Sequence, residues 1–122
     1  GSALVGFRIR AREGAEAAAP LWRYCALRDA DGRSRILEDV RFEPLRRWQS
    51  PRSGARYPVA MRIDLPGRSL QLQPLMDDQE LDGRASTGTI YWEGAVRVSE
   101  ADGRESGLGY LELTGYRSPI RL

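Results

Sequence analysis

The feature that most constrains this chain is an alternation of apolar and other side chains between residues 57 and 65. The apolar members of the series are Tyr57, Val59, Met61, Ile63 and Leu65. A period of two puts alternate side chains on opposite faces of an extended strand. The segment is therefore predicted to be a strand with one buried face.

Similar short apolar stretches recur along the chain and predict seven or eight strands in all. Besides residues 57–65, the predicted strands cover residues 5–9, 21–28, 35–42, 70–73, 89–98 and 107–116. Turn residues such as Asp31-Gly32, Pro66-Gly67 and Asp102-Gly103 separate them. With no amphipathic helix in sight, the pattern predicts an antiparallel all-β sandwich or barrel.

Two stretches are predicted to be loops. Residues 45–56 and 77–88 are rich in polar and small side chains. Pro44, just before the first loop, is expected either to stop the preceding strand or to place it at the edge of a sheet.

The composition excludes several kinds of catalytic or metal site. The 122 residues include 19 arginines, one cysteine, no lysine and no histidine. Without histidine the chain can form neither a Ser-His pair nor an imidazole metal ligand, and without lysine it has no Schiff-base or P-loop lysine. Because Cys25 is the single cysteine, the chain can form neither an internal disulfide nor a zinc ribbon. No metal site is predicted, and the acid-base candidates are carboxylates, tyrosines and Cys25.

The distribution of charge argues against a nucleic-acid partner. The 19 basic residues face 17 acidic ones, and the two signs are interspersed without a basic helix or arm. We therefore interpret the arginine excess as codon bias. No apolar run approaches the roughly 18 residues that span a membrane, and no signal peptide is visible after Gly1-Ser2, which resembles an expression scar.

The last predicted hairpin carries an unusual pair of carboxylates. If Asp102-Gly103 is a two-residue turn, Glu93 lies directly opposite Glu112. Like charges in this position destabilise a strand pair. Either an arginine such as Arg97 neutralises them, or one carboxyl is protonated and could act as a general acid. A solvated face with two flexible glutamates is the alternative, and a longer turn would shift the register.

Four segments, in order, resemble signatures of one family. They are W-Q-S-P-R-S-G-A-R-Y-P at 48–58, D-Q-E-L at 78–81, Y-W-E-G-A-V at 91–96 and G-Y-L-E-L-T-G-Y at 109–116. This set is similar to the AttH-type lipocalin-like family, often labelled predicted secreted hydrolases and related to carotenoid 1,2-hydratase. The resemblance begins near Trp22. It departs from the family at Met61, where a tryptophan is expected.

The resemblance implies an antiparallel lipocalin-like (calycin) β-barrel with a hydrophobic cavity. Members of the family contain two such barrels in tandem, and this chain resembles the C-terminal one. We accordingly assign residues 1–20 to an expression scar plus an N-terminal strand or linker, and residues 21–122 to the C-terminal barrel domain. The N-terminal barrel of the same protein is the expected partner, and the cell envelope, periplasmic or secreted, is the expected location.

The resemblance also implies chemistry on an isoprenoid, polyene or lipid, by hydration or cyclisation without a cofactor. Hydration of an alkene needs a carboxylic acid kept neutral in an apolar pocket, and aromatic faces could stabilise the cation. The predicted catalytic residues are Glu93, Glu112 and Asp78. The predicted ligand-binding residues are Trp48, Tyr57, Gln79, Glu80, Tyr91, Trp92, Tyr110 and Tyr116.

Other interpretations of the same residues stay open. Asp78 and Glu80 could form a solvated turn, and the large aromatic side chains could belong to the core. Cys25 is expected to be a small buried hydrophobe. At the level of function, three classes remain: an enzyme domain, a non-catalytic lipid carrier, and a structural barrel that supports a catalytic N-terminal barrel.

Overall fold

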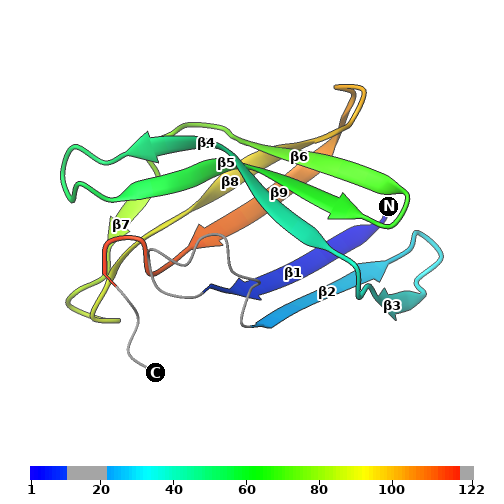
Figure 1. The fold of residues 1–122 in the computed structure, drawn as a ribbon, viewed down its shortest axis with the longest axis horizontal. Coiled ribbons are helices and arrows are strands. Elements are labelled where there is room, and N and C mark those ends of the chain that lie inside the picture. The colour runs from blue at the N-terminus through cyan, green and yellow to red at the C-terminus, as the bar shows by residue number, and fades with distance from the viewer. Residues whose placement is uncertain (11–21, 119–122) are drawn as a thin grey trace.

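The structure is a computed structural model that describes residues 1–10 and 22–118, in which nine strands form two antiparallel sheets (Figure 1). The smaller sheet has the order β1–β2–β3, with β1 at Ala3–Ile9, β2 at Trp22–Arg28 and β3 at Ser34–Ile36. The larger has the order β4–β5–β6–β8–β7, and β9 pairs with β8 on its other side. Its strands are β4 (Arg41–Gln49), β5 (Arg56–Leu65), β6 (Arg68–Pro74), β7 (Glu80–Asp82), β8 (Ile90–Glu100) and β9 (Glu105–Leu113).

The prediction of an all-β antiparallel fold is confirmed. A closed barrel is not shown: within the described residues β1 does not pair with β9, so the two sheets do not join into one. The described part of the chain contains no helix, and hence none able to cross a membrane.

The loop predicted at residues 45–56 is wrong over its first part. The strand β4 runs through Pro44 and ends only at Gln49. This strand lies at the edge of its sheet, where a proline such as Pro44, which has no N–H, is tolerated. Its register with β5 shifts on both sides of Arg46. The predicted strand 35–42 is instead divided between β3 and β4, and β7 lies inside the predicted loop 77–88.

The β8–β9 hairpin places Glu93 opposite Glu112, as predicted. The turn itself differs from the prediction. The Glu100 N–H donates to the Arg104 carbonyl at 2.8 Å, which leaves residues 101–103 as a three-residue loop. A one-residue shift in register between Val98 and Ser99 then compensates for the extra residue.

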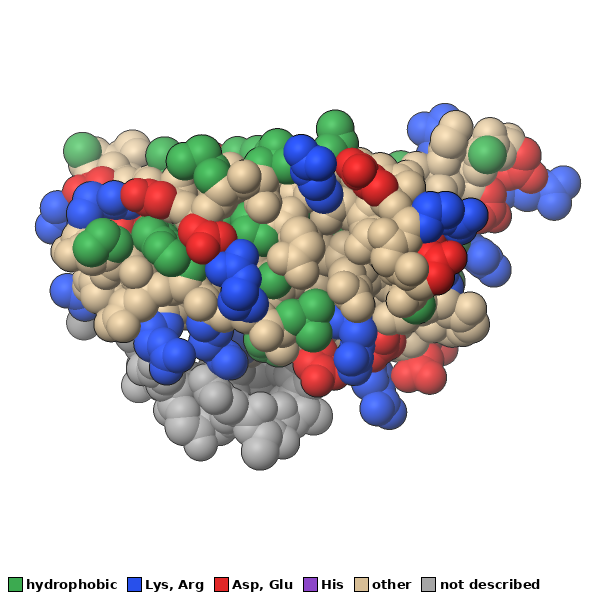
Figure 2. All heavy atoms as spheres, turned by 90° about the horizontal axis from the view of Figure 1, so that it is seen from above, with side chains coloured by type: hydrophobic (Ala, Val, Ile, Leu, Met, Phe, Trp, Pro, Cys, Tyr) green, Lys and Arg blue, Asp and Glu red, His purple; other side chains and the backbone are tan. Residues whose placement is uncertain are grey.

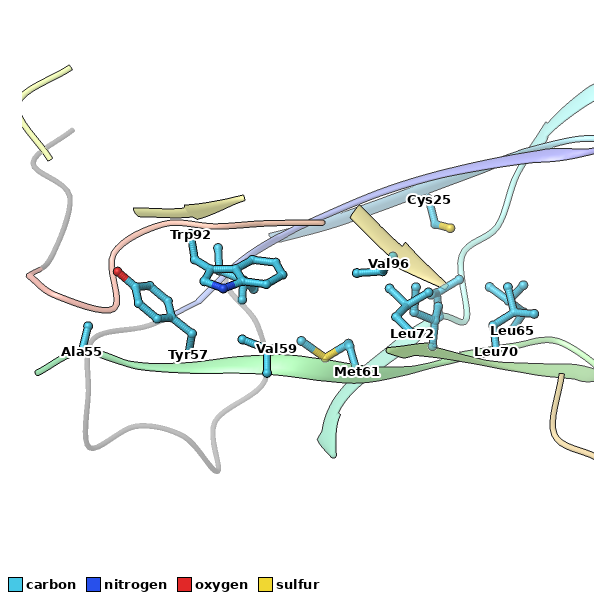
Figure 3. Packing of buried hydrophobic residues seen from close by; sticks show 13 residues of the cluster. Cys25, Ala55, Tyr57, Val59, Met61, Leu65, Leu70, Leu72, Trp92 and Val96 are labelled. Carbon is cyan, nitrogen blue, oxygen red and sulfur yellow. The ribbon is translucent and has the colours of Figure 1, made fainter. Parts of the chain in front are cut away.

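The core lies on the inner face of the larger sheet (Figure 3). All five inward residues predicted on β5 are buried, together with Leu70 and Leu72 of β6 and Trp92 and Val96 of β8. Tyr57 and Trp92 fill one end of this core, Leu65 and Leu70 the other, and Cys25 comes from the smaller sheet. Each such side chain stabilises the fold by about 1.5–3 kcal/mol relative to an exposed one.

Cys25 is buried as expected, and burial raises the pKa of its thiol. On the surface, basic and acidic side chains are interspersed, as Figure 2 shows for one face of the molecule. Several form ion pairs between neighbouring strands, among them Arg62 with Glu43 and Arg68 with Glu100.

Candidate functional site

A cavity of about 400 Å³ lies between the two sheets. The larger sheet lines it with Met61, Ile63, Leu70, Leu72, Val96 and Leu111, and the smaller sheet adds Leu4, Gly6 and Leu27. Small-molecule pockets typically measure about 300–1,000 Å³ and are mostly apolar, with a few placed polar groups. The inter-sheet cavity falls within this range of sizes, and its lining combines apolar side chains with several polar and charged groups.

Four charged residues are also among those that line the inter-sheet cavity: Arg8, Arg10, Arg68 and Glu112. Arg68 is ion-paired with Glu100, and the Glu112 carboxylate accepts a hydrogen bond from the Thr114 hydroxyl at 3.1 Å. The two arginines of β1 and its C-terminal flank instead make contacts with neutral groups.

Three of the predicted site residues line the cavity, namely Glu112, Tyr110 and Tyr116. The other eight do not: Trp48, Tyr57, Asp78, Gln79, Glu80, Tyr91, Trp92 and Glu93. Their roles as catalytic or ligand-binding residues stay predictions. Most of them lie together in a second place, where β7 meets the turn between β4 and β5.

The second place is built around the carboxylate of Glu80, whose side chain is only 3% exposed. It accepts hydrogen bonds from the Ser50 hydroxyl at 2.7 Å, the Ser53 hydroxyl at 2.5 Å and the Tyr57 hydroxyl at 2.8 Å. We call these four residues the Glu80 cluster. Every carboxylate oxygen has a donor, so the buried charge is well compensated.

The turn between β4 and β5 is shaped to present both serine hydroxyls. The Ser50 hydroxyl oxygen accepts the N–H groups of Arg52 and Ser53, each at 3.2 Å, and Gly54 takes a positive φ of 74°. Short polar side chains that bond to backbone N–H groups stabilise such turns, and glycine adopts a positive φ without strain. The segment S-P-R-S-G therefore folds locally into one half of the Glu80 cluster.

The cluster fixes its own protonation state. Burial alone would raise the pKa of Glu80, but the hydrogen bonds from Ser53, Ser50 and Tyr57 outweigh it and lower that pKa below its usual value. Burial, followed by the bond to Glu80, raises the pKa of Tyr57. An ionised Glu80 among three donors is suited to hold the turn against β7 and has no proton to give.

Two arginines hold the acidic segment before β7. Arg52 binds both oxygens of Asp78, at 2.7 and 2.5 Å, and Arg46 binds both oxygens of Asp77, at 2.9 and 2.8 Å. These hydrogen bonds are the main cause of the lowered pKa of each aspartate. The Trp92 indole N–H donates to the Asp77 carbonyl at 2.7 Å. Asp78 is thus an ionised partner of Arg52 in this structure.

Gln79 lies against the backbone of β8. Its Oε1 accepts the Ala95 N–H at 3.1 Å and its Nε2 donates to the Ala95 carbonyl at 3.3 Å. A Cβ added to Gly94 would lie 2.1 Å from the Gln79 side chain. The glycine is therefore required by this close approach.

Glu93 and Glu112 lie on the outer face of the β8–β9 pair, where Glu93 is half-buried and Glu112 exposed. Neither forms an ion pair with a described residue, so the expected neutralisation by Arg97 is not seen there. Tyr110, next to this pair, has a raised pKa, first through desolvation and then through the nearby Glu93 carboxylate. The described residues contain no cluster of three or more potential metal ligands.

A family model described as AttH-like matches residues 1–116. The chain belongs to the AttH-like family. The match reaches further toward the N-terminus than the resemblance that starts near Trp22, and it includes β1. No match was found among curated proteins.

Two solved structures resemble the AttH-like chain. One is an AttH protein of Nitrosomonas europaea, with 50% identity and a TM-score of 0.84, covering 95% of this chain and 35% of that one. The other is kievitone hydratase of Nectria haematococca, with 19% identity and a TM-score of 0.67, covering 92% of this chain and 34% of that one. The second likeness concerns the fold alone. This chain spans about a third of the length of each structure.

The four AttH-like segments meet in space, and their contacts are largely with one another. The first supplies the hydroxyls of the Glu80 cluster, the second supplies Glu80 and Gln79, the third supplies Gly94, and the fourth supplies Tyr116, whose ring centroid lies 5.8 Å from that of Tyr57. Trp48 stacks on Tyr57 at 6.3 Å. These contacts give the family segments a structural role.

Arg8 and Arg10, which line the inter-sheet cavity, were not among the predicted site residues. Their alternation with Phe7 and Ile9 was visible, but it does not say which face turns inward. Ser50 and Ser53 of the Glu80 cluster were not predicted as site residues either. The pattern S-P-R-S-G, with hydroxyls one and four residues before a glycine, was the available signal.

Proposed function

We propose that this AttH-like chain binds a hydrophobic small molecule in the inter-sheet cavity. The observation that carries the proposal is the lining: apolar side chains from both sheets surround about 400 Å³ that no described side chain fills. A domain that only supported another barrel would gain stability by packing this space, because cavities of such size weaken a core. The open interior therefore favours ligand binding over a purely structural role.

Hydration of the bound molecule is a second candidate. It is favoured by Glu112, which is among the residues around the cavity together with Tyr110 and Tyr116, and by the likeness in fold to a protein named as a hydratase. In such a step the carboxyl would give its proton to an alkene carbon, and water would add to the resulting cation and lose a proton. Cyclisation or carriage of an isoprenoid, polyene or lipid would use the same cavity.

Three further points belong to the proposal. The two sheets correspond to a lipocalin-like barrel that is open between β1 and β9. An N-terminal barrel of the same protein is the partner, which is supported by the one-third coverage of both solved structures. The protein acts in the cell envelope.

The binding proposal is tested with N-phenyl-1-naphthylamine, an uncharged fluorophore that brightens in apolar sites. Gly107 lines the cavity, and a Cβ added there would meet no atom within 4 Å. The substitution Gly107→Phe has room for its Cβ, should place its ring in the cavity and should weaken binding at least about tenfold.

The matched control is Gln73→Phe, which adds the same ring at an exposed position of β6 outside the cavity lining. It should leave binding unchanged. Failure of the wild-type chain to bind the fluorophore, or equal binding by the Gly107→Phe variant, would contradict the proposal.

The hydration candidate is tested in the longer protein with a panel of isoprenoid and polyene alkenes. Glu112→Gln should abolish turnover, whereas Glu93→Gln, on the same outer pair but away from the cavity lining, should retain it. Unchanged turnover in the Glu112→Gln variant would exclude this glutamate as the acid.

A further inference from the structure

The inter-sheet cavity has one end lined by arginine side chains, and we infer that its ligand is an amphiphile with an anionic head group. The inference rests on the proposed function, because it assigns the chemistry of the molecule that the cavity would hold. The apolar walls would take the hydrocarbon part, and the guanidinium groups of Arg8 and Arg10 would take the head group.

The cavity-facing row of the β1–β2 pair changes in character along the strands. At one end Leu4 pairs with Leu27, and next to it Gly6 pairs with Cys25. At the other end Arg8 lies directly opposite Arg23 on the same face. Arg10, which follows β1, lines the cavity beyond them. A ligand lying along this row would meet apolar groups first and positive charge last.

Two arginines directly opposite each other are unfavourable in an antiparallel pair. Among residues 1–10 and 22–118, no carboxylate forms an ion pair with Arg8, Arg10 or Arg23. In the larger sheet, by contrast, arginines such as Arg62 and Arg68 have acidic partners. An anion at this end would relieve the repulsion between the two guanidinium groups.

The arginines that line the cavity are held in place by neutral groups. Arg8 donates to the Phe42 carbonyl at 2.8 Å, and its guanidinium carbon lies 5.8 Å from the centre of the Phe42 ring. The Arg10 guanidinium carbon lies 3.7 Å from the centre of the Tyr116 ring, and the group also donates to the Thr114 carbonyl at 3.5 Å. These contacts orient the cations, and no carboxylate of the described residues forms an ion pair with them.

The other charged groups of the lining fit this assignment. Arg68 is already paired with Glu100. Glu112 is the one carboxylate among the described lining residues, and it accepts a bond from Thr114. The described lining thus includes three arginines and one glutamate, whose side chain lies on the outer face of the β8–β9 pair, and this favours an anionic ligand over a cationic one.

The test uses the whole 122-residue chain with N-phenyl-1-naphthylamine as a neutral reporter. The competitors share a dodecyl chain and differ in the head group: dodecanoate, dodecanol and dodecyltrimethylammonium, each below its micelle concentration. Dodecanoate should displace the reporter at a concentration about tenfold lower than dodecanol, because a charge-assisted hydrogen bond is stronger than a neutral one. Dodecyltrimethylammonium should be the weakest competitor.

In the double variant Arg8→Gln/Arg10→Gln, the advantage of dodecanoate over dodecanol should disappear while dodecanol itself competes as before. Arg10→Gln alone should remove part of the advantage, and it keeps the Arg8 bond to β4 in case the double variant does not fold. Arg28→Gln, at an exposed position of β2 outside the lining, is the matched control and should change nothing.

Equal displacement by dodecanoate and dodecanol in the wild-type chain, with the reporter bound, would overturn the anionic head group and leave the cavity proposal standing. An advantage that survives the double variant would overturn the role of the two arginines. Absence of reporter binding would overturn the proposed function and this inference with it.

Discussion

The two sheets differ in what they expose to the solvent. In the larger sheet the apolar residues point inward and are buried, while ion pairs such as Arg62 with Glu43 lie outside. In the smaller sheet the apolar row of β1 points outward, with Phe7 55% exposed, and Arg8 and Arg10 line the interior. Trp22 stacks on Tyr24 on this outer face, at 6.2 Å between ring centres.

The difference teaches that alternation alone does not choose the buried face. Both β1 and β5 alternate with a period of two, and each could pack either way. On β1 the face that carries Gly6 turns inward. The lack of a side chain at Gly6 leaves room for the Phe42 ring, since an added Cβ would lie 3.0 Å from it. A side chain at this position would push β1 away from β4.

The sharpest test of the comparison is the cost of removing one aromatic ring from each sheet. Trp92→Ala should lower the free energy of unfolding by about 3–5 kcal/mol, because this fully buried side chain would leave a cavity. Phe7→Ala should cost less than about 1 kcal/mol, because more than half of the ring is already in water. Urea unfolding curves of the chain measure both values.

A cost for Phe7→Ala close to that of Trp92→Ala would mean that the outer face of the smaller sheet is covered in solution. The comparison between the sheets would then fail.

A smaller effect is expected where the larger sheet buries a charge. Glu80→Gln should lower the free energy of unfolding by about 1–3 kcal/mol, because the three hydroxyl donors lose a charged acceptor. The control is Asp82→Asn on the same strand, whose pair with Arg84 is exposed to solvent and screened, so its loss should change the free energy of unfolding much less.

This effect should depend on pH in one direction. The pKa of Glu80 is lower in the folded chain than the ordinary value of about 4.3. Its contribution is therefore complete above that ordinary value and is lost as the pH falls through the lower folded pKa. Unfolding curves of wild type and Glu80→Gln should converge in acid, and a gap that stayed constant would contradict an ionised Glu80.

The smallest effect concerns the like-charged pairs, of which each sheet has one. Glu112→Gln should stabilise the fold by about 0.2–1 kcal/mol by removing the repulsion with Glu93, and Arg23→Gln should act similarly on Arg8. Thermal unfolding at low salt measures both changes. A clear loss of stability in either variant would show that the charge has a partner in solution.

The fold was predictable where packing and pattern agree. The inward row of β5 and the pairing of Glu93 with Glu112 follow from the sequence. The pairing was reached through a wrong turn, because the bulge between Val98 and Ser99 cannot be seen in a pattern of hydrophobicity. Strand β4 was missed for a related reason: whether Pro44 ends a strand or lies on an edge depends on the neighbouring strands.

The candidate site was less predictable. The resemblance drew attention to Asp78, Gln79 and Glu80, yet their hydrogen bonds join family segments to one another. Which carboxylates are buried, and which arginines face the cavity, depends on contacts between residues far apart in the chain. The bond from Arg8 to Phe42 spans 34 residues, and no local pattern encodes it.

Gln79 has a consequence for the integrity of the molecule. Strand β6 covers one edge of β8 from Val96 onward and β7 covers it up to Trp92. In the gap between them, the Glu93 N–H donates to the Gln79 carbonyl and the Ala95 carbonyl accepts the Leu75 N–H. The Gln79 amide fills this gap by accepting and donating at Ala95, as a strand residue would. Without this amide the Ala95 N–H would lose its acceptor at the edge of β8, and an unpaired N–H of this kind is what another strand can pair with, so the Gln79 side chain closes this edge.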